Sequence, residues 1–192
     1  MNPIVCIAGP SGSGKSTLIE FLTRERHEYE KIYAATTRTL RPHEIDRKHI
    51  DHATFQQLVT EDKIVLPRFV YNTWYGISKE DISIALTQNK IPLLDRPVEH
   101  IPEFKEFFPE HRILSIYLVP CIDTLQQRLQ RRNLPEQRYS AALQELEELQ
   151  QGTYPYLDFI VQNNTDSSAT GDMVNHFIKT ATLEKHVQAQ KR

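Results

Sequence analysis

The chain has 192 residues, a formal net charge of −2 and 39% hydrophobic residues, which predicts one globular domain with a buried core. The near-neutral charge provides no basic field for nucleic acid, and no apolar run approaches the roughly 20 residues that span a bilayer. Cys6 and Cys121 form no C-x-x-C pair, and no signal-peptide pattern opens the chain. We therefore expect a cytoplasmic protein without nucleic-acid or membrane partners.

Residues 9–16 read G-P-S-G-S-G-K-S, the G-x-x-x-x-G-K-S pattern of a phosphate-binding loop, or P-loop. The apolar run 4–8 before it predicts a buried parallel strand, and the spacing of the apolar residues in 18–22 predicts a helix that begins near Lys15. Glycines let the backbone bring N–H groups close to phosphate oxygens. The residues expected to bind ATP are Gly9, Ser11, Gly12, Ser13, Gly14, Lys15, Ser16 and Thr17.

Two side chains of this loop have a specific chemical part in phosphate binding. Lys15 is expected to reach the β- and γ-phosphates of ATP as a point charge. Ser16 is expected to offer its hydroxyl to Mg²⁺. The loop therefore predicts a site for MgATP.

A second strand is predicted over residues 31–35, followed by a polar stretch that carries Arg38, Arg41 and Lys48. One interpretation is a solvated charged loop. The other is a separate anion site, in which arginine forks bind a second phosphate bidentately. Both interpretations stay open at this point.

The next segment predicts small elements. They are a short helix over 54–60 capped by Thr54, and strands 64–66 and 69–71 separated by Pro67. A turn at 72–73 makes a hairpin with residues 74–75. Ser78 is expected to cap a helix that begins near Lys79. Residues 35–78 thus read as a small lobe inserted in the parallel sheet.

An apolar strand over 91–95 ends in Asp95, which is placed either to act on Mg²⁺ or simply to begin a turn. A helix over 99–108 is expected to face the sheet with three phenylalanines, and 113–119 is the clearest interior strand. The three phenylalanines are Phe104, Phe107 and Phe108.

Arginines gather near a helix break further along the chain, at Arg128, Arg131, Arg132 and Arg138. Asp123 lies near the start of the first helix, and 136–150 forms the second, amphipathic one. This pattern predicts either a lid that closes over a nucleotide or a solvated helical hairpin. A last strand is expected over 156–161, and the closing helix has Thr170 or Asp172 as cap, with Met173 among its inward residues.

The order of these pieces resembles the guanylate kinase family over nearly the whole chain. Four blocks carry the resemblance: the P-loop; Thr36-Thr37-Arg38 with Arg41-Pro42 and Glu44; Tyr75-Gly76 with Ser78; and Arg128-Leu129 with Arg131-Arg132-Asn133 and Arg138. The P-loop is common to many NTPases, but together with Thr-Thr-Arg about twenty residues later it becomes fairly specific.

The resemblance implies roles for individual residues. Arg38 and Arg41 would bind the phosphate of the acceptor with help from Tyr75, and Glu44 and Ser78 would belong to the acceptor site. The family's lid arginines would be Arg128, Arg132 and Arg138, which would neutralise the transferring phosphoryl group. Asp95 would match the first acidic residue of the family's Asp-x-Asp, in the acceptor site and near Mg²⁺.

The sequence also departs from the family pattern. Ala34-Ala35 and Lys48-His49-Ile50 stand where family members have a serine and an acceptor-lobe tyrosine. The guanine-reading acidic residue of the lobe strand has no counterpart in 66–69, and Pro97 replaces the second aspartate. A guanine pocket that lacks these carboxylates loses about 1–3 kcal/mol for each unpaired group.

We therefore expect a P-loop NTPase-type α/β fold with three α/β/α layers, a parallel five-stranded sheet, an inserted acceptor-binding lobe and a helical lid. The core would span 1–34, 79–120 and 151–185, the lobe 35–78 and the lid 121–150 of one domain. The expected activity is Mg²⁺-dependent phosphoryl transfer from ATP to a nucleoside monophosphate, with GMP as the first candidate. The alternatives are another phosphorylated acceptor such as ribose 1,5-bisphosphate, and a non-catalytic interaction module.

Overall fold

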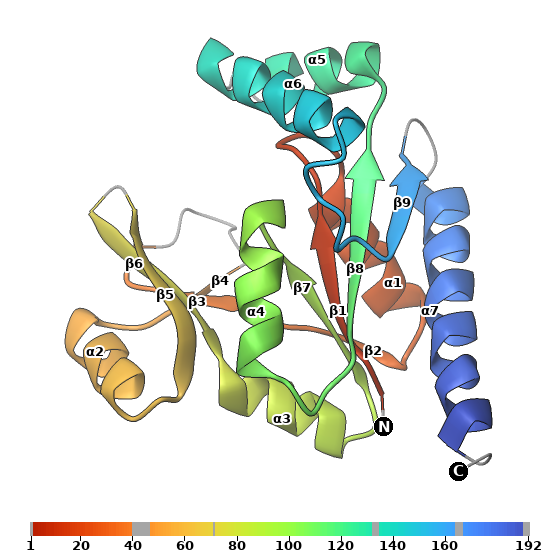
Figure 1. Cartoon of the computed structure of the whole chain (residues 1–192). Helices are drawn as coiled ribbons and strands as arrows, with labels where there is room; N and C mark the ends of the chain where they lie inside the picture. Colours follow the sequence, from red (N-terminus) through yellow and green to blue (C-terminus); the bar gives the residue numbers. More distant parts are fainter. Residues whose placement is uncertain (1, 40–46, 71, 132–134, 164–166, 190–192) are drawn as a thin grey trace.

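The computed structural model describes residues 2–39, 47–70, 72–131, 135–163 and 167–189 (Figure 1). Its first sheet has five strands, and all of their pairings are parallel. From edge to edge they are β2 (Tyr29–Lys31), β7 (Ile91–Asp95), β1 (Ile4–Ala8), β8 (Ile113–Val119) and β9 (Phe159–Gln162). The parallel five-stranded sheet expected from the apolar runs is confirmed.

Alternate residues of the central strand β1 enter two separate cores. Val5 and Ile7 pack with the helices of one face, α1 (Lys15–Glu25) and α7 (Ser167–Ala189). Ile4 and Cys6 pack with the elements of the other face. These elements are α3 (Lys79–Thr87), the 3₁₀ turn η1 (Val98–His100) and α4 (Ile101–Phe107). Side chains of a strand alternate between faces, so β1 is apolar throughout because both faces are covered.

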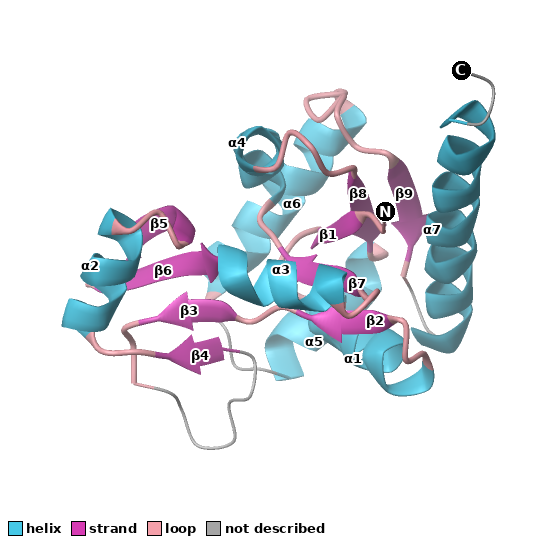
Figure 2. Ribbon diagram, turned by 90° about the horizontal axis from the view of Figure 1, so that it is seen from below, coloured by secondary structure: helices cyan, strands magenta, loops and turns pink. Residues whose placement is uncertain are grey.

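A second sheet lies to one side of the first, with its strands side by side in Figure 2. In spatial order they are β4 (Arg47–His49), β3 (Ala34–Thr36), β6 (Thr73–Ser78) and β5 (Ile64–Val70). Helix α2 (His52–Thr60) covers one face through Phe55, which packs with Ala35, Ile64 and Trp74. The sheet begins at Ala34, one residue before the predicted start of the inserted lobe.

Two helices, α5 (Ile122–Arg131) and α6 (Glu136–Gln150), lie beyond the carboxyl end of β8, at the top of Figure 1. Helix α6 has the bounds that its amphipathic pattern predicted. Both helices bury apolar residues in the core cluster that includes Tyr117 of β8. These residues are Leu125, Leu129, Ala142 and Leu146. Along the described ranges, no helix is both long enough and apolar enough to cross a membrane.

The single strand predicted over 31–35 is wrong, because the chain changes sheets within it. Lys31 pairs with Leu93 in the first sheet, and the Ile32 N–H donates to the Leu93 carbonyl at 2.9 Å. Two residues later Ala34 pairs in the second sheet. A continuous β-prone run cannot reveal such a crossing, since sheet membership depends on which distant strands are neighbours.

The prediction that Pro67 separates two strands is wrong. Strand β5 continues through it, and the pairing with β6 shifts register between Val65 and Arg68. Leu66 has a φ of +52°, which marks the irregular position. A proline is tolerated inside a strand at such a bulge, where its missing N–H breaks no ladder bond.

Two helix starts also differ from the prediction. Asp51, and not Thr54, caps α2, because its carboxylate accepts from the Thr54 N–H at 2.9 Å. Helix α7 begins at Ser167, so that Thr170 and Asp172 lie inside it. Ser78 caps α3 as predicted, since its Oγ accepts from the Asp81 N–H at 3.1 Å.

Some residues predicted to face inward lie at the surface instead. Phe107 is 37% exposed and Met173 is 47% exposed, whereas Phe104 is fully buried. Strand β9 begins at Phe159, later than predicted, because the preceding Asp158 turns its carboxylate to the Ser115 N–H at 2.7 Å.

Candidate active site

The P-loop joins the end of β1 to the start of α1, as predicted from the strand, glycine and helix pattern. Gly9 and Gly14 have φ values of +136° and +96°, which L side chains rarely adopt. A Cβ at Gly9 would lie 2.6 Å from the Leu118 carbonyl oxygen, and one at Gly14 would lie 2.4 Å from Nδ2 of Asn163. The loop therefore needs glycine at both positions.

The side chains of the loop fit an anion cradle. Lys15 Nζ donates to the carbonyl oxygens of Gly9 at 2.7 Å and Pro10 at 3.1 Å, so the ammonium lies over the loop itself. Ser13 is buried, and within the described ranges its Oγ has no hydrogen-bond partner. Ser16 is half-buried and Thr17 is exposed. The unpaired N–H groups at the start of α1 add donors and positive potential to the cradle.

Arg128 and Asn163 support the P-loop from outside it. Arg128 Nη1 on α5 lies 3.2 Å from the carbonyl oxygen of Gly12, 3.3 Å from that of Ser13 and 3.4 Å from that of Asn163. Asn163 follows β9, and its Nδ2 donates to the Ser13 carbonyl at 2.6 Å while its Oδ1 accepts from Thr170 at 3.1 Å. These bonds fix the loop to two later parts of the chain.

Asp95 lies at the carboxyl edge of the first sheet, beside the start of the loop. It pairs with Ile7 of β1, and its side chain is exposed. The next residue, Arg96, donates its backbone N–H to the Ile7 carbonyl at 3.0 Å. Over the described residues there is no cluster of three or more His, Cys, Asp or Glu side chains that could hold a metal ion. Ser16 and Asp95 are oxygen donors of the kind that Mg²⁺ prefers when phosphates supply its remaining ligands.

The Thr-Thr-Arg motif forms the end of β3 and the bend after it. Thr36 is buried, and its Oγ1 accepts from the Arg38 N–H at 3.2 Å. The Thr37 N–H donates to the Trp74 carbonyl at 3.1 Å, and Thr37 Oγ1 accepts from the Trp74 N–H at 3.0 Å. The two threonines thus hold the backbone that presents Arg38.

Tyr75 lies between two strands in the second sheet. It pairs with Thr36 on β3 and with Arg68 on β5. Residues opposite each other in an antiparallel pair share a face, so Tyr75 and Arg68 lie on the same side of the sheet. Arg68 forms an ion pair with Glu103 of α4, which joins this side to the first sheet.

Among the remaining predicted residues, some lie in parts of the chain that the structure does not describe and others lie at its surface. Arg41, Glu44 and Arg132 lie outside the described residues. Arg138 is exposed on α6. Lys48, one of the cations of the possible second anion site, forms an ion pair with Asp81 at 3.4 Å.

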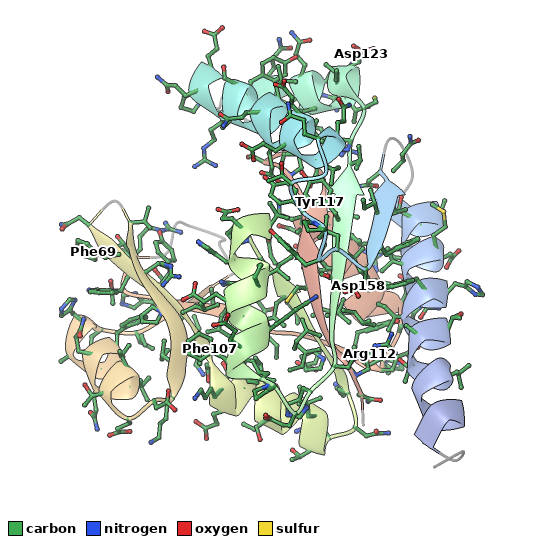
Figure 3. The ribbon with its side chains drawn as sticks, viewed as in Figure 1. Phe69, Phe107, Arg112, Tyr117, Asp123 and Asp158 are labelled. Atoms are coloured by element: carbon green, nitrogen blue, oxygen red, sulfur yellow. The ribbon has the colours of Figure 1, made fainter. Side chains whose placement is uncertain are left out.

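Sequence reasoning missed three residues near the site: Arg96, Glu145 and Asn163. Burial lowers the pKa of the Arg96 guanidinium, and Asp95 and Glu103 oppose this shift. Burial raises the pKa of Glu145 on α6, although the Tyr117 hydroxyl donates to it at 2.8 Å and Lys15 is nearby. Figure 3 shows Tyr117 on β8, below the two upper helices. The only signal for Arg96 and Asn163 was their place just after a predicted strand.

The P-loop lies at the carboxyl edge of a parallel sheet, which α1 and α7 cover on one face and α3 and α4 on the other. This arrangement defines a P-loop α/β protein of the nucleotide-binding class. The sequence model of the family described as guanylate kinase matches residues 1–186. The chain therefore belongs to the guanylate kinase family.

Individual relatives agree with this assignment. A guanylate kinase of Legionella pneumophila is 29% identical over 196 residues, which cover 97% of this chain and 90% of the relative. One of Bdellovibrio bacteriovorus is 33% identical over 133 residues, covering 68% and 71%. The crystal structure of guanylate kinase from Anaplasma phagocytophilum has a TM-score of 0.67 at 21% identity, covering 94% of this chain and 86% of that one, which supports the fold.

Proposed function

We propose that this protein transfers the γ-phosphoryl group of ATP to GMP, giving ADP and GDP. Membership of the guanylate kinase family supports a nucleoside monophosphate kinase. The observation that carries the proposal is the intact P-loop, with Lys15 Nζ over it and Ser13 Oγ enclosed in it, at the sheet edge that also presents Asp95. A chain that had become an interaction module would have no need of this cradle.

The donor site in this proposal is the P-loop. Its amides and Lys15 bind the β- and γ-phosphates, and the loop serines and Thr17 line the same site. Ser16 and Asp95 would hold Mg²⁺ together with the phosphates, and the ion would supply positive charge to neutralise charge developing on the transferred group. Arg128, Arg132 and Arg138 then belong to a lid over residues 121–150. Arg128 is already in contact with the loop backbone, which supports its place in this group.

The acceptor site in this proposal is the lobe of residues 35–78 and its border with the first sheet. Arg38 and Arg41 bind the phosphate of GMP with Tyr75, while Glu44 and Ser78 complete the lobe side. The hydrogen bonds of Thr36 and Thr37 give Arg38 a defined backbone, which favours a positioning task. Little covalent chemistry falls to the protein, so holding two anions in line supplies most of the rate acceleration.

The two alternatives drawn from the sequence receive no support from these relatives. All three carry the name guanylate kinase, and none is named as a kinase for ribose 1,5-bisphosphate or as a non-catalytic module. The altered base-reading positions therefore raise a question about how guanine is recognised, and GMP stays the proposed acceptor.

The test is ADP release from ATP with a panel of acceptors: GMP, dGMP, AMP, UMP, CMP and ribose 1,5-bisphosphate. We expect saturable turnover with GMP and dGMP in the presence of Mg²⁺. Removing the charge of a phosphate-binding residue, in Lys15→Met or Arg38→Ala, should lower turnover by about 10²–10³-fold. Lys179→Met is the matched control, because Lys179 is an exposed cation on α7 that pairs with Glu28. Near-normal turnover in Lys15→Met, or turnover with ribose 1,5-bisphosphate alone, would reject the proposal.

A further inference from the structure

Arg96 is a buried cation to which the proposed phosphate chemistry gives no role. Arg96 is only 7% exposed to solvent. Nε is enclosed and has no hydrogen-bond partner among the described residues, and the guanidinium lies over the Phe104 ring, 5.8 Å from its centroid. Burying a charge without a hydrogen-bonded partner costs stability. A side chain kept in such a position is expected to find its partner in a ligand.

The surroundings of Arg96 place it at the border between the two sheets. Its backbone binds Ile7 of β1 directly before the P-loop. The charges that act on its guanidinium include Arg68 of β5, Glu103 of α4 and Asp95. Arg68 and Glu103 form an ion pair with each other, in which one carboxylate oxygen of Glu103 accepts from Arg68. The Arg68 charge therefore acts on the Arg96 guanidinium where β7, α4 and the second sheet come together.

The bulge in β5 determines which face of the second sheet carries Arg68. Val65 pairs with Ile77, so that regular pairing would set Arg68 opposite Trp74, on the face that packs against α2. The register shift sets it opposite Tyr75 instead. Arg68 thereby shares the face of Tyr75, which is the face directed toward α4 and Arg96.

Two positions beside these arginines, Leu66 and Pro97, have side chains that cannot accept a hydrogen bond from a base. Leu66 is buried in the core, and Pro97 follows Arg96 directly. Guanine presents the acceptors O6 and N7 side by side on one edge, and a guanidinium matches this edge bidentately. Adenine has an amine donor in place of O6, which would face the donors of an arginine.

We propose, on the basis of the GMP kinase function above, that Arg96 assisted by Arg68 recognises the acceptor base through its O6 and N7 edge. Selection then depends on the base accepting hydrogen bonds from arginine, and the N2 amine of guanine contributes little. Arg96 is in this sense a specificity-determining residue, and Glu103 orients Arg68 beside it.

Base analogues test this mode of recognition with the wild-type chain. IMP keeps O6 and N7 and lacks the N2 amine, so its kcat/KM should be within about threefold of that of GMP, whereas loss of a bidentate partner should cost about 10- to 100-fold with 7-deaza-GMP and AMP. If GMP is turned over, a kcat/KM more than tenfold lower with IMP than with GMP, together with an unchanged kcat/KM with 7-deaza-GMP, would overturn this inference but leave the proposed function standing. Absence of GMP turnover would reject the proposed function as well, so the two failures are distinguishable.

Variants of Arg96 separate recognition from folding. Arg96→Met should raise KM for GMP by about 10- to 100-fold and reduce the preference for GMP over AMP, with a Tm equal to or above that of the wild type. Arg96→Lys, which keeps the charge without the fork, should give an intermediate KM. Arg24→Met is the control, because Arg24 is an exposed arginine on α1 that forms an ion pair with its neighbour Glu25. A lowered Tm with unchanged KM and unchanged GMP preference in Arg96→Met would show a structural role and overturn the inference.

Discussion

At the scale of a single side chain, Glu145 joins helix α6 to strand β8 by a hydrogen bond to Tyr117. Glu145 lies on α6 and accepts a hydrogen bond from Tyr117 at 2.8 Å, and the positive charge of Lys15 acts to lower its pKa. Burial raises the pKa of Glu145 above its ordinary value of 4.5 and outweighs the opposing effects of Tyr117 and Lys15. The carboxyl group therefore binds a proton more readily in the folded chain than in the unfolded one.

This raised pKa predicts a pH-dependent effect of Glu145→Gln. The wild type loses the contribution of Glu145 as pH rises from about 4.5 through the higher folded pKa, because the unfolded state ionises first. Glutamine keeps an acceptor for Tyr117 and does not ionise. Relative to the wild type, the variant should therefore gain stability between pH 4.5 and neutral pH.

Urea denaturation of both proteins from pH 4 to pH 8 measures this difference. Glu147→Gln is the control, since Glu147 is an exposed carboxylate on the same helix. A difference between Glu145→Gln and wild type that stays constant with pH, or that falls as pH rises, would contradict the prediction.

At the scale of elements, α1 and α7 cover the same face of the first sheet and approach closely at Gly171. A Cβ built on Gly171 would lie 2.4 Å from Cε1 and 2.5 Å from Cδ1 of Phe21. The guanidinium of Arg26 also lies over the Phe21 ring, 5.5 Å from the ring centroid, and Arg26 forms an ion pair with Asp172. The spacing of the two helices thus depends on the absence of a side chain at one position.

Gly171→Ala tests whether packing or helix propensity decides stability here. Propensity alone predicts a gain of up to about 1 kcal/mol for alanine over glycine inside a helix. Displacement of the Phe21 ring should outweigh it, and we expect a net loss of about 1–2 kcal/mol in the free energy of unfolding. Thr180→Ala, at an exposed position of α7, should be neutral or slightly stabilising.

A double-mutant cycle locates the cause. Phe21→Leu should remove much of the penalty of Gly171→Ala, because the ring atoms that obstruct the new Cβ are gone. A net gain of stability in Gly171→Ala, or equal effects of the substitution in both backgrounds, would show that the close contact does not limit the packing.

At the scale of the whole molecule, three bodies of structure meet around the P-loop. The base of the second sheet packs into the main core through Leu66 and Ile77, and the upper helices join the same core through Leu125 and Leu146. Farther from the core, the connections include exposed ion pairs such as Lys48–Asp81. Such ion pairs contribute about 0–1 kcal/mol each to stability. The outer parts of the second sheet and of the upper helices are therefore weakly restrained.

We predict that a ligand joining both substrates draws these parts together. An adenosine–guanosine pentaphosphate should slow backbone hydrogen exchange in α6 and in strands β3 and β6 more than ATP and GMP do when each is bound alone. The reason is that only the bridging ligand contacts the lobe, the loop and the lid arginines together. Exchange that equals the sum of the separate effects would contradict closure of the lobe and lid over the substrates.

Local patterns in the sequence determined the elements that depend on neighbours along the chain. The P-loop with its flanking strand and helix, strand β8, helix α6 and the Ser78 cap were all predicted, because glycine spacing, apolar periodicity and capping chemistry act within a few residues. Family membership was also predicted, since its motifs are short and fixed in spacing.

Only the tertiary structure decided the features that depend on distant strands. The change of sheet after Lys31, the bulge that turns Arg68 toward Tyr75, the contact of Asn163 with the P-loop and the enclosure of Arg96 involve partners far away in the chain. Strand pairing and burial are set by long-range packing, on which a local pattern of residue types gives no information. The phosphate-binding motif is therefore visible in the sequence, whereas the groups proposed to recognise the acceptor base emerge only from the fold.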